Sequence, residues 1–283
     1  SQVQALTTSQ VQFLTSVQLN ALEPEDLQAL TSAQIRSLTT PQTSTLSLGQ
    51  VTTLTTEQVV ALSTAQVQSL TSSQLNMLEV DDLQALTSTQ IRGLSTEQVA
   101  NLSVDQLMTL TTSQVSALTT TQVQALTSTQ LNGMDQEDFQ ALTSVQVRSL
   151  TSSQLQALSE DQIVGLTTSQ VAALTTSQVQ SLTSAQLNLM EAQDLQALTT
   201  AQIRSLTTGQ IAGLSIDQVP QLTTSQVAAL TSDQIRVLGD QSIVALTTAQ
   251  VQALTTSQVQ SLTSSQLNAF EAEDLQALTT AQI

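Results

Sequence analysis

The chain has no Cys, His, Trp or Tyr, and all five of its basic residues are Arg, so Lys is missing as well. These absences exclude disulfides, thiol and imidazole nucleophiles, metal sites built from Cys or His, and Schiff-base chemistry on Lys. Phe is the only aromatic residue and occurs three times. The core must therefore be aliphatic. From the missing nucleophiles and metal ligands we predict neither enzyme activity nor a cofactor.

Positive charge is also scarce. The five Arg stand against 22 Asp and Glu, which gives a formal net charge of −17. Such a chain repels phosphate backbones and anionic lipid surfaces, so we expect no nucleic-acid partner. No apolar run approaches the roughly 20 residues that cross a bilayer, so we expect no membrane insertion.

What the chain does contain is one eight-residue unit, repeated from end to end. Leu opens each unit, as at Leu54, Leu62 and Leu70, with Met or Phe as its rare replacements. Two small hydroxyl or acidic residues follow, then a variable residue, Gln at the fifth position and an apolar residue at the sixth. The sixth position is polar only at Thr43, and the eighth is mostly small. A repeat array of this kind is a single domain of arbitrary length.

Each octad carries the start signal of a helix. Thr55 followed three residues later by Gln58 is the capping-box pattern, in which each side chain hydrogen-bonds the other residue's backbone N–H. Leu54 and Val59 are spaced as the hydrophobic staple that often accompanies this box. Because the next cap comes eight residues later, we predict one helix of about six or seven residues per octad.

Two other folds compete with this interpretation. In one long helix, eight residues overshoot two turns by about 80°, so the leucine stripe would wind around the rod. An even period suits a β-solenoid, but the apolar first and sixth positions are an odd number of residues apart, and the turn signals of hairpins are missing. The pattern favours an all-α solenoid and leaves the β-solenoid as the alternative.

A longer period overlies the octad. Acidic octads begin at Leu22, Leu78, Met134 and Met190, which is a step of seven octads, and the last begins ten octads later at Phe270. If these octads share one face, a coil contains about 3.3–3.5 octads, or roughly 27 residues. The alternative is that seven octads is only the length of a duplicated unit.

Short helices are marginal alone, so the coil must bury the first and sixth positions between its turns. We therefore predict a single continuous octapeptide-repeat solenoid over residues 1–283. Small eighth-position residues should let backbones approach closely, and fifth-position Gln should form amide ladders between coils. Because the chain begins and ends within an octad and lacks polar capping repeats, we expect a fragment of a longer repeat protein.

Three prolines test the helical interpretation. Pro24 and Pro41 fall in the first turn of predicted helices, where the missing N–H does no harm. Pro220 falls at the seventh position, inside a predicted helix. We expect that octad to be distorted or barely longer than one turn.

The acidic octads are the candidate site. Hard cations such as Ca²⁺ take several oxygen ligands, and these octads offer them in series. The structural alternative is that the carboxylates stabilise helix N-termini and that the fifth-position Asp replaces the capping Gln. Arg follows ten residues after Asp, as in Asp26 and Arg36, and we expect it to pair with an acidic residue. No catalytic residue is predicted. The candidate Ca²⁺ ligands are Glu23, Glu25, Asp26, Glu79, Asp81, Asp82, Asp135, Glu137, Asp138, Glu271, Glu273 and Asp274.

Residues 54–62, with the sequence LTTEQVVAL, resemble the opening helix of the TAL-effector repeat, LTPEQVVAI. This resemblance covers one helix and implies a Thr-capped start, but the base-reading loop and basic character of that family are absent. The whole chain is similar to the LTxxQVxAL octapeptide tracts of very long secreted bacterial proteins of the adhesin and repeat-toxin type. That resemblance implies a structural role outside the cell or at its surface.

Two functions follow as hypotheses. The first is an extracellular filament or adhesin stalk that associates with itself in fibres or with cell-surface components. The second is an α-solenoid scaffold that binds a protein partner. O-glycosylation of the many Ser and Thr residues also stays open.

Overall fold

The computed structural model describes residues 2–280 and 282, and all regular elements in this part of the chain are short helices. The prediction of one helix per octad is confirmed, and the long helix and the β-solenoid are wrong. The α-helices are four to six residues long, slightly shorter than predicted. They fall into two compact units, Ser1–Leu142 and Thr143–Ile283.

The first unit consists of helices connected by extended cap residues. In chain order they are η1 (Val3–Ala5), α1 (Thr8–Phe13), α2 (Ser16–Asn20), α3 (Pro24–Gln28), α4 (Ser32–Ser37), α5 (Thr40–Ser44), α6 (Leu48–Thr52), α7 (Thr56–Ala61), α8 (Thr64–Ser69), α9 (Ser72–Leu75), α10 (Val80–Ala85), α11 (Ser88–Gly93), α12 (Thr96–Ala100), α13 (Val104–Met108), α14 (Thr112–Ala117), α15 (Thr120–Ala125), α16 (Ser128–Gly133) and α17 (Gln136–Ala141).

The second unit continues the same pattern. Its helices are α18 (Ser144–Ser149), α19 (Ser152–Gln156), α20 (Glu160–Val164), α21 (Thr168–Ala173), α22 (Thr176–Ser181), α23 (Ser184–Leu189), α24 (Ala192–Ala197), α25 (Thr200–Ser205), α26 (Thr208–Ala212), η2 (Val219–Gln221), α27 (Thr224–Ala229), α28 (Ser232–Arg236), α29 (Asp240–Val244), α30 (Thr248–Ala253), α31 (Thr256–Ser261), α32 (Ser264–Ala269) and α33 (Ala272–Ala277).

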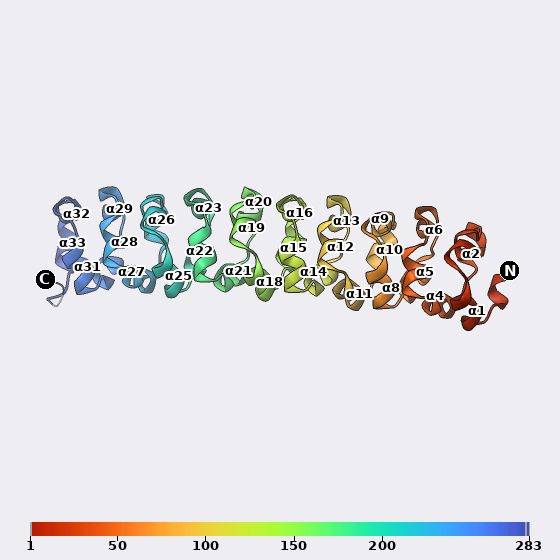
Figure 1. The fold of residues 1–283 in the computed structure, drawn as a ribbon. Helices are drawn as coiled ribbons and strands as arrows, with labels where there is room; N and C mark the ends of the chain where they lie inside the picture. Colours follow the sequence, from red (N-terminus) through yellow and green to blue (C-terminus); the bar gives the residue numbers. More distant parts are fainter. Residues whose placement is uncertain (1, 281, 283) are drawn as a thin grey trace. The chain divides into compact units, whose positions relative to one another are not determined.

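Within each unit the chain winds into coils that stack on one another. Helices pack mainly against the helix three octads away, as α4 does against α1 and α7, and α21 against α18 and α24. Figure 1 shows the stacking, for example of α13 beside α16 in the first unit and of α29 beside α32 in the second. Side-chain hydrogen bonds between coils span 25 to 31 residues, which brackets the coil length predicted from the acidic octads.

The core lies on the inner side of the coil, where the first and sixth positions meet. Val171 is completely buried and Leu174 is only 4% exposed, and most other octads repeat this pair. The prediction of an aliphatic interior is confirmed. Among large side chains only Phe139 and Phe270 add aromatic rings to it.

The capping box starts most of the helices. The Thr55 hydroxyl accepts from the Gln58 N–H at 3.3 Å, and the Gln58 Oε1 accepts from the Thr55 N–H at 3.1 Å. Each box satisfies two backbone donors that a helix N-terminus leaves without an intrahelical acceptor. The caps predicted from Thr and Gln spacing are therefore present.

The prolines behave as predicted. Pro24 is the first residue of α3, and Pro41 is the second residue of α5. Pro220 replaces the α-helix of its octad by the three-residue 3₁₀ helix η2. The ring lacks an N–H and so removes a backbone donor, which leaves only a tight turn there.

The eighth position explains why the repeat needs a small residue before the next Leu. A Cβ added at Gly93 would overlap the Thr64 methyl group, and one added at Gly133 would overlap Val104 Cγ1. These partners belong to the preceding coil. The predicted close approach of coils is confirmed at these positions.

Candidate functional site

Fifth-position Gln residues hold neighbouring coils together. In the first unit, Gln58 Nε2 donates to the carbonyl oxygens of Leu27 at 2.8 Å and Leu30 at 2.9 Å. In the second, Gln226 Nε2 donates to the carbonyl oxygens of Leu195 and Leu198, both at 2.7 Å. The amide thus binds the backbone of the preceding coil. The predicted amide ladders between coils are therefore present, and they run from Gln side chains to backbone carbonyls because the oxygen of each amide is used in the capping box.

Seventh-position residues connect each coil to the following one. Asn20 Nδ2 donates to the Thr45 carbonyl at 2.8 Å, and Gln28 Nε2 donates to the Thr53 carbonyl at 3.0 Å. Arg36 makes the same contact through Nε, at 3.2 Å from the Ala61 carbonyl. Each of these bonds spans 25 residues. Sequence reasoning treated this position as variable and missed its role.

Asn76 shows what happens when two such contacts compete. Its Nδ2 donates to the Asn101 carbonyl at 2.9 Å, and its Oδ1 accepts from the Ser103 N–H at 3.2 Å. Ser103 is the N-cap of α13, so its N–H would ordinarily bind Gln106. Gln106 Oε1 is consequently buried without a hydrogen-bond partner in the structure.

The acidic octads begin helices, as predicted, but their first carboxylates differ in what they do. Asp135 accepts from the Asp138 N–H at 2.8 Å and caps α17. The N-cap Glu residues make no side-chain cap hydrogen bond. Glu is one methylene longer than Asp, and only the shorter side chain folds back onto the helix end. The N-cap Glu residues are Glu23, Glu79, Glu191 and Glu271.

The fifth-position Asp residues do not fully replace the capping Gln. Within residues 2–280 no acidic octad forms a capping box, because Asp is shorter than Gln. An ionised Asp also has no donor for the carbonyl oxygens of the preceding coil. Four of these Asp residues are nevertheless 5–7% exposed, where Gln would be buried and bonded. The acidic octads thus lack a complete capping box and an amide donor, although Asp194 keeps a backbone hydrogen bond at its N-cap residue Glu191. The four buried residues are Asp82, Asp138, Asp194 and Asp274.

The environment of these groups makes ionisation unfavourable. Burial raises the pKa of Asp138 to about 6, and the negative charges of Asp135 and Glu137 add to the increase. Burial also raises the pKa of Asp194, with a further contribution from Glu191, while a backbone hydrogen bond at Glu191 acts in the opposite direction. In two acidic octads, therefore, the fifth-position Asp has a raised pKa.

The candidate calcium ligands are distributed along the coils. Among residues 2–280 and 282, no group of three or more Asp or Glu is arranged so that it could hold a metal ion. Glu23, Asp81 and Glu137, for example, are all exposed to solvent. Calcium binding by the acidic octads stays a prediction for a titration with Ca²⁺ to test.

The acidic residues do share one edge of each unit, which we call the acidic edge. It consists of the octads of α3, α10, α13 and α17 in the first unit, and of α20, α24, η2, α29 and α33 in the second. Successive members are three, four or seven octads apart, which is one or two coils. In the second unit α24 contacts η2 directly. All acidic residues except Glu57, Glu97 and Asp233 belong to these octads.

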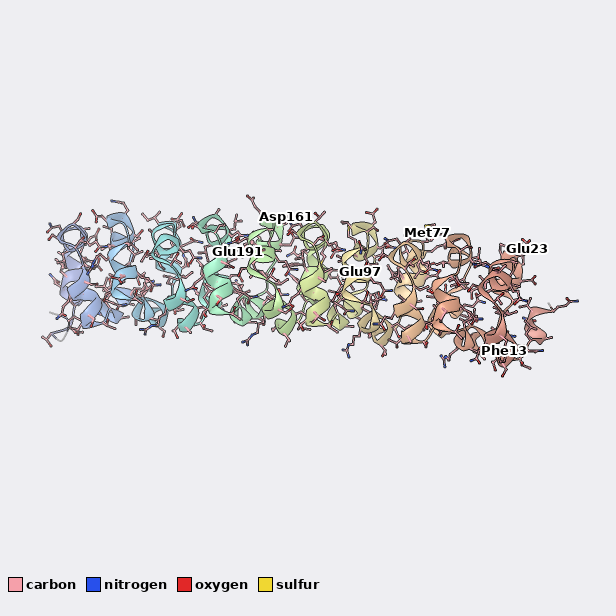
Figure 2. All side chains as sticks on the ribbon, in the orientation of Figure 1. Phe13, Glu23, Met77, Glu97, Asp161 and Glu191 are labelled. Atoms are coloured by element: carbon pink, nitrogen blue, oxygen red, sulfur yellow. The ribbon has the colours of Figure 1, made fainter. Side chains whose placement is uncertain are left out.

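Sequence reasoning found only part of this edge. It recognised the octads with three or more acidic residues or their close copies, at the seven-octad step. It missed Asp105, Glu160, Asp161, Asp217 and Asp240, which occupy the intervening coils. Their spacing of three or four octads from the recognised copies was the available signal. In Figure 2, Asp161 lies at the upper margin of the second unit, and Glu191, also of the acidic edge, lies lower on that unit.

Apolar side chains are exposed along the acidic edge as well. Val80 is 49% exposed and Met108 is 46% exposed in the first unit. Met77, 41% exposed, lies at the upper margin of that unit in Figure 2 and belongs to the octad of α9, which directly precedes the octad of α10. Val80 also lines a small cavity of about 80 Å³ together with Asp105 of the next coil. In the second unit the exposed large apolar residues of this edge are Val164, Ile216, Val244 and Leu275.

The Arg residues lie away from the acidic edge. Arg36 and Arg92 end α4 and α11, on the lower side of the first unit in Figure 1, and each binds a carbonyl of the next coil through Nε. Arg148 and Arg204 end α18 and α25, on the lower side of the second unit. The prediction that these Arg pair with acids is wrong: in the described part of the chain the sole ion pair is Arg236–Asp233, at 3.9 Å.

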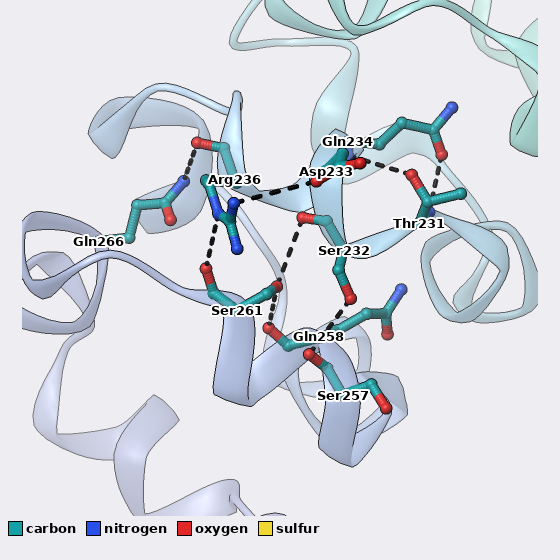
Figure 3. A network of polar contacts seen from close by, with 9 residues as sticks. All are labelled: Thr231, Ser232, Asp233, Gln234, Arg236, Ser257, Gln258, Ser261 and Gln266. Carbon is teal, nitrogen blue, oxygen red and sulfur yellow. Dashed lines mark hydrogen bonds and ion pairs between the residues drawn. The ribbon is translucent and has the colours of Figure 1, made fainter.

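Figure 3 shows the contacts around that ion pair. Ser261 Oγ donates to the Ser232 carbonyl at 3.4 Å, and Arg236 Nε donates to the Ser261 carbonyl at 3.5 Å. Gln266 Nε2 reaches the Arg236 carbonyl at 3.3 Å. The ion pair is exposed on both sides and contributes little, so the coil-to-coil hydrogen bonds determine the local geometry.

Open grooves separate neighbouring coils on the hydroxyl-rich sides. One of about 620 Å³ lies between the cap of α4 and the cap of α7, and a second of about 490 Å³ lies between the caps of α8 and α11. Their walls are mostly Thr, Ser and Gln, many of which already serve as caps. Such walls offer hydrogen bonds but no nucleophile activated by a neighbouring base. The residues of the larger groove are Gln28, Leu30, Thr31, Ser32, Thr55, Thr56, Glu57 and Gln58.

These features define the class of the protein as an α-solenoid of capped one- to two-turn helices. The sequence matches the model of the ALTTAQ repeat family at residues 19–56, 75–112, 131–168, 187–224 and 227–264, together more than half of the chain. The chain therefore belongs to the ALTTAQ repeat family. A comparison with curated proteins found no match.

The fold and the family together indicate a repeat-based structural scaffold. A tandem array of equivalent coils has no single site at which one set of residues differs from all others, which is typical of non-catalytic proteins. None of the helices in residues 2–280 is both long and apolar enough to cross a membrane.

Proposed function

We propose that this protein is a structural element of an extracellular filament or adhesin stalk. The observation that carries the proposal is the Gln amide of nearly every ordinary octad, which links each coil to the preceding one. Because the contact is internal to the repeat, the array can be extended without changing the way in which coils are joined. The structure thus favours a role in which length and continuity matter.

The proposed location outside the cell or at its surface is supported by composition and resemblance. The chain contains neither Cys nor Lys and has a net charge of −17, which favours solubility. Its octads are similar to tracts of very long secreted bacterial proteins. We propose no nucleic-acid partner, no membrane insertion, no cofactor and no catalytic activity, and self-association in fibres or contact with cell-surface components as the mode of assembly.

Electron microscopy of the purified chain tests the structural role. A stalk element should appear as a thread of uniform width, and antibodies against the chain should label intact cells of the source. A compact particle, or labelling only after the cells are broken open, would contradict the proposal.

A second candidate function is a scaffold that binds a protein partner. The observation in its favour is the acidic edge, which combines carboxylates with exposed apolar residues such as Val80 and Met108. Aromatic or aliphatic anchors within a charged rim are typical of interfaces. Recovery of one stoichiometric partner, lost when Asp81 and Glu137 are neutralised but retained when Glu57 and Glu97 are neutralised, would favour this function.

A further inference from the structure

Four exposed Arg residues, two in each unit, have no acidic partner in the described part of the chain. Arg36 and Arg92 use Nε to bind the next coil, and both residues are exposed to solvent. Neither they nor Arg148 and Arg204 form an ion pair in the described part of the chain. We call these four residues the Arg row.

Each unit therefore carries opposite charges on two different sides. In the first unit, α4 and α11 of the Arg row lie on the lower side of Figure 1, and α13 of the acidic edge lies on the upper side. In the second unit, α18 and α25 lie on the lower side, and α20 and α29 on the upper. Only Glu57, Glu97 and Asp233 lie outside the acidic edge, so the Arg row faces little negative charge of its own.

We propose that two copies of this chain bind side by side, with the Arg row of one copy against the acidic edge of the other. The inference rests on the structural role proposed above and names the surfaces through which self-association occurs. Guanidinium groups prefer carboxylates as planar, two-pronged partners, and the acidic edge presents them in exposed positions such as Asp81 and Glu137.

The two surfaces match in spacing. Arg36, Arg92, Arg148 and Arg204 recur every seven octads, the same step as the acidic octads that begin at Leu22, Leu78, Met134 and Met190. Within one unit this step is two coils, so a contact made at one coil brings the next Arg opposite the next acidic octad. Repeated weak pairs along one interface then act together, as linked binding sites do.

The acidic edge also offers apolar surface to the second copy. Val80 and Met108 are each at least 46% exposed, and the aliphatic stem of Arg can cover such groups while its charge meets a carboxylate. The net charge of −17 opposes approach at low ionic strength. We therefore expect association to be strongest near physiological salt, and to weaken toward 1 M salt, where the Debye length is about 3 Å and contact pairs are screened.

Charge exchange in the full chain tests the pairing by sedimentation velocity. The first variant carries Arg36→Glu, Arg92→Glu and Arg204→Glu, and the second carries Asp81→Arg, Glu137→Arg and Glu191→Arg. We expect the wild-type chain to dimerise with rising concentration, and each variant alone to lose at least about tenfold in association constant. An equimolar mixture should recover association, because each variant supplies the charge that the other lacks.

The matched control for the second variant carries Glu57→Arg, Glu97→Arg and Asp233→Arg, which adds the same six positive charge units to the net charge of −17 but away from the acidic edge. It should associate at least as well as the wild-type chain. Circular dichroism of every variant verifies that the helices are retained. A monomeric wild-type chain, an equal loss in the control, or no recovery on mixing would overturn the pairing. A monomer that still appears as a thread would overturn the pairing alone and leave the structural role intact.

Discussion

Octads 54–61 and 134–141 differ at six of their eight positions, and the differences at the second and fifth show what the repeat needs. In octad 54–61, Thr55 and Gln58 close a capping box, and Gln58 also binds the preceding coil. In octad 134–141, Asp135 caps its helix, while Asp138 neither completes the box nor supplies an amide donor. Both octads still form six-residue helices.

The comparison separates two roles within the repeat. The apolar first and sixth positions suffice to form a helix and place it in the coil, since Met134 is 2% and Phe139 is 1% exposed without the amide bond. The Gln adds stability and joins coils. The acidic octads lack the hydrogen bonds of the Gln amide and carry negative charge at one edge instead. A local loss of stability of this kind is typical of surfaces used for recognition.

The largest loss of stability should come from truncating a buried apolar residue of the first position, which both octads share. Leu174→Ala removes a side chain that is 4% exposed and leaves a cavity between coils, so we expect a loss of about 2–5 kcal/mol in the free energy of unfolding. Urea denaturation followed by circular dichroism measures it. Met108→Ala, at a side chain 46% exposed, should cost under about 0.5 kcal/mol. Equal costs at the two sites would contradict the assignment of Leu174 to the core.

The next largest loss should come from removing the fifth-position Gln, which only octad 54–61 has. Gln58→Ala removes the acceptor of the Thr55 N–H and the donor to the Leu27 and Leu30 carbonyls, so we expect a loss of about 2–3 kcal/mol. The same urea experiment applies. Gln4→Ala, at an exposed seventh-position residue, is the control and should be nearly neutral. A neutral result for Gln58 would mean that coils are held by apolar contacts alone.

The reciprocal change should repair the acidic octad. Because the pKa of Asp138 is raised to about 6, its ionised form destabilises the folded state above that pH, and the penalty is relieved as pH falls from about 6 to 4. Asp138→Gln removes this penalty and also supplies the amide that an ordinary octad uses, so we expect a gain that is larger at pH 7.5 than at pH 4 by about 1–2 kcal/mol, after allowance for solvent screening.

Melting curves of the two chains between pH 4 and 8 measure this difference. Asp81→Asn, at an exposed carboxylate of the equivalent octad one period earlier, is the control. It should change stability by the same small amount at both ends of the range. A gain from Asp138→Gln that is as large at pH 4 as at pH 7.5 would show that ionisation is not its cause.

Much of this architecture could be predicted from the octad itself. Thr and Gln three residues apart identified the helix starts, and Pro220 identified the distorted octad, because capping and proline effects depend only on neighbours in the chain. The partners of Gln58 and Arg36 could not be predicted. They lie 25 to 31 residues away, and the sequence does not indicate which backbone group of the next coil faces a given side chain.

The smallest effect concerns the caps and sharpens the contrast at the second position. Thr55→Ala removes a hydroxyl that accepts from the Gln58 N–H at 3.3 Å, and we expect a loss of about 1 kcal/mol. Glu79→Ala should cost no more than a few tenths, because Glu79 makes no cap hydrogen bond and adds only its charge near the helix N-terminus. Glu79→Thr should then stabilise the chain, since Thr supplies the acceptor that Glu79 fails to place. If Glu79→Ala proved as costly as Thr55→Ala in urea denaturation, the acidic N-caps would act through charge as strongly as hydroxyls act through hydrogen bonds.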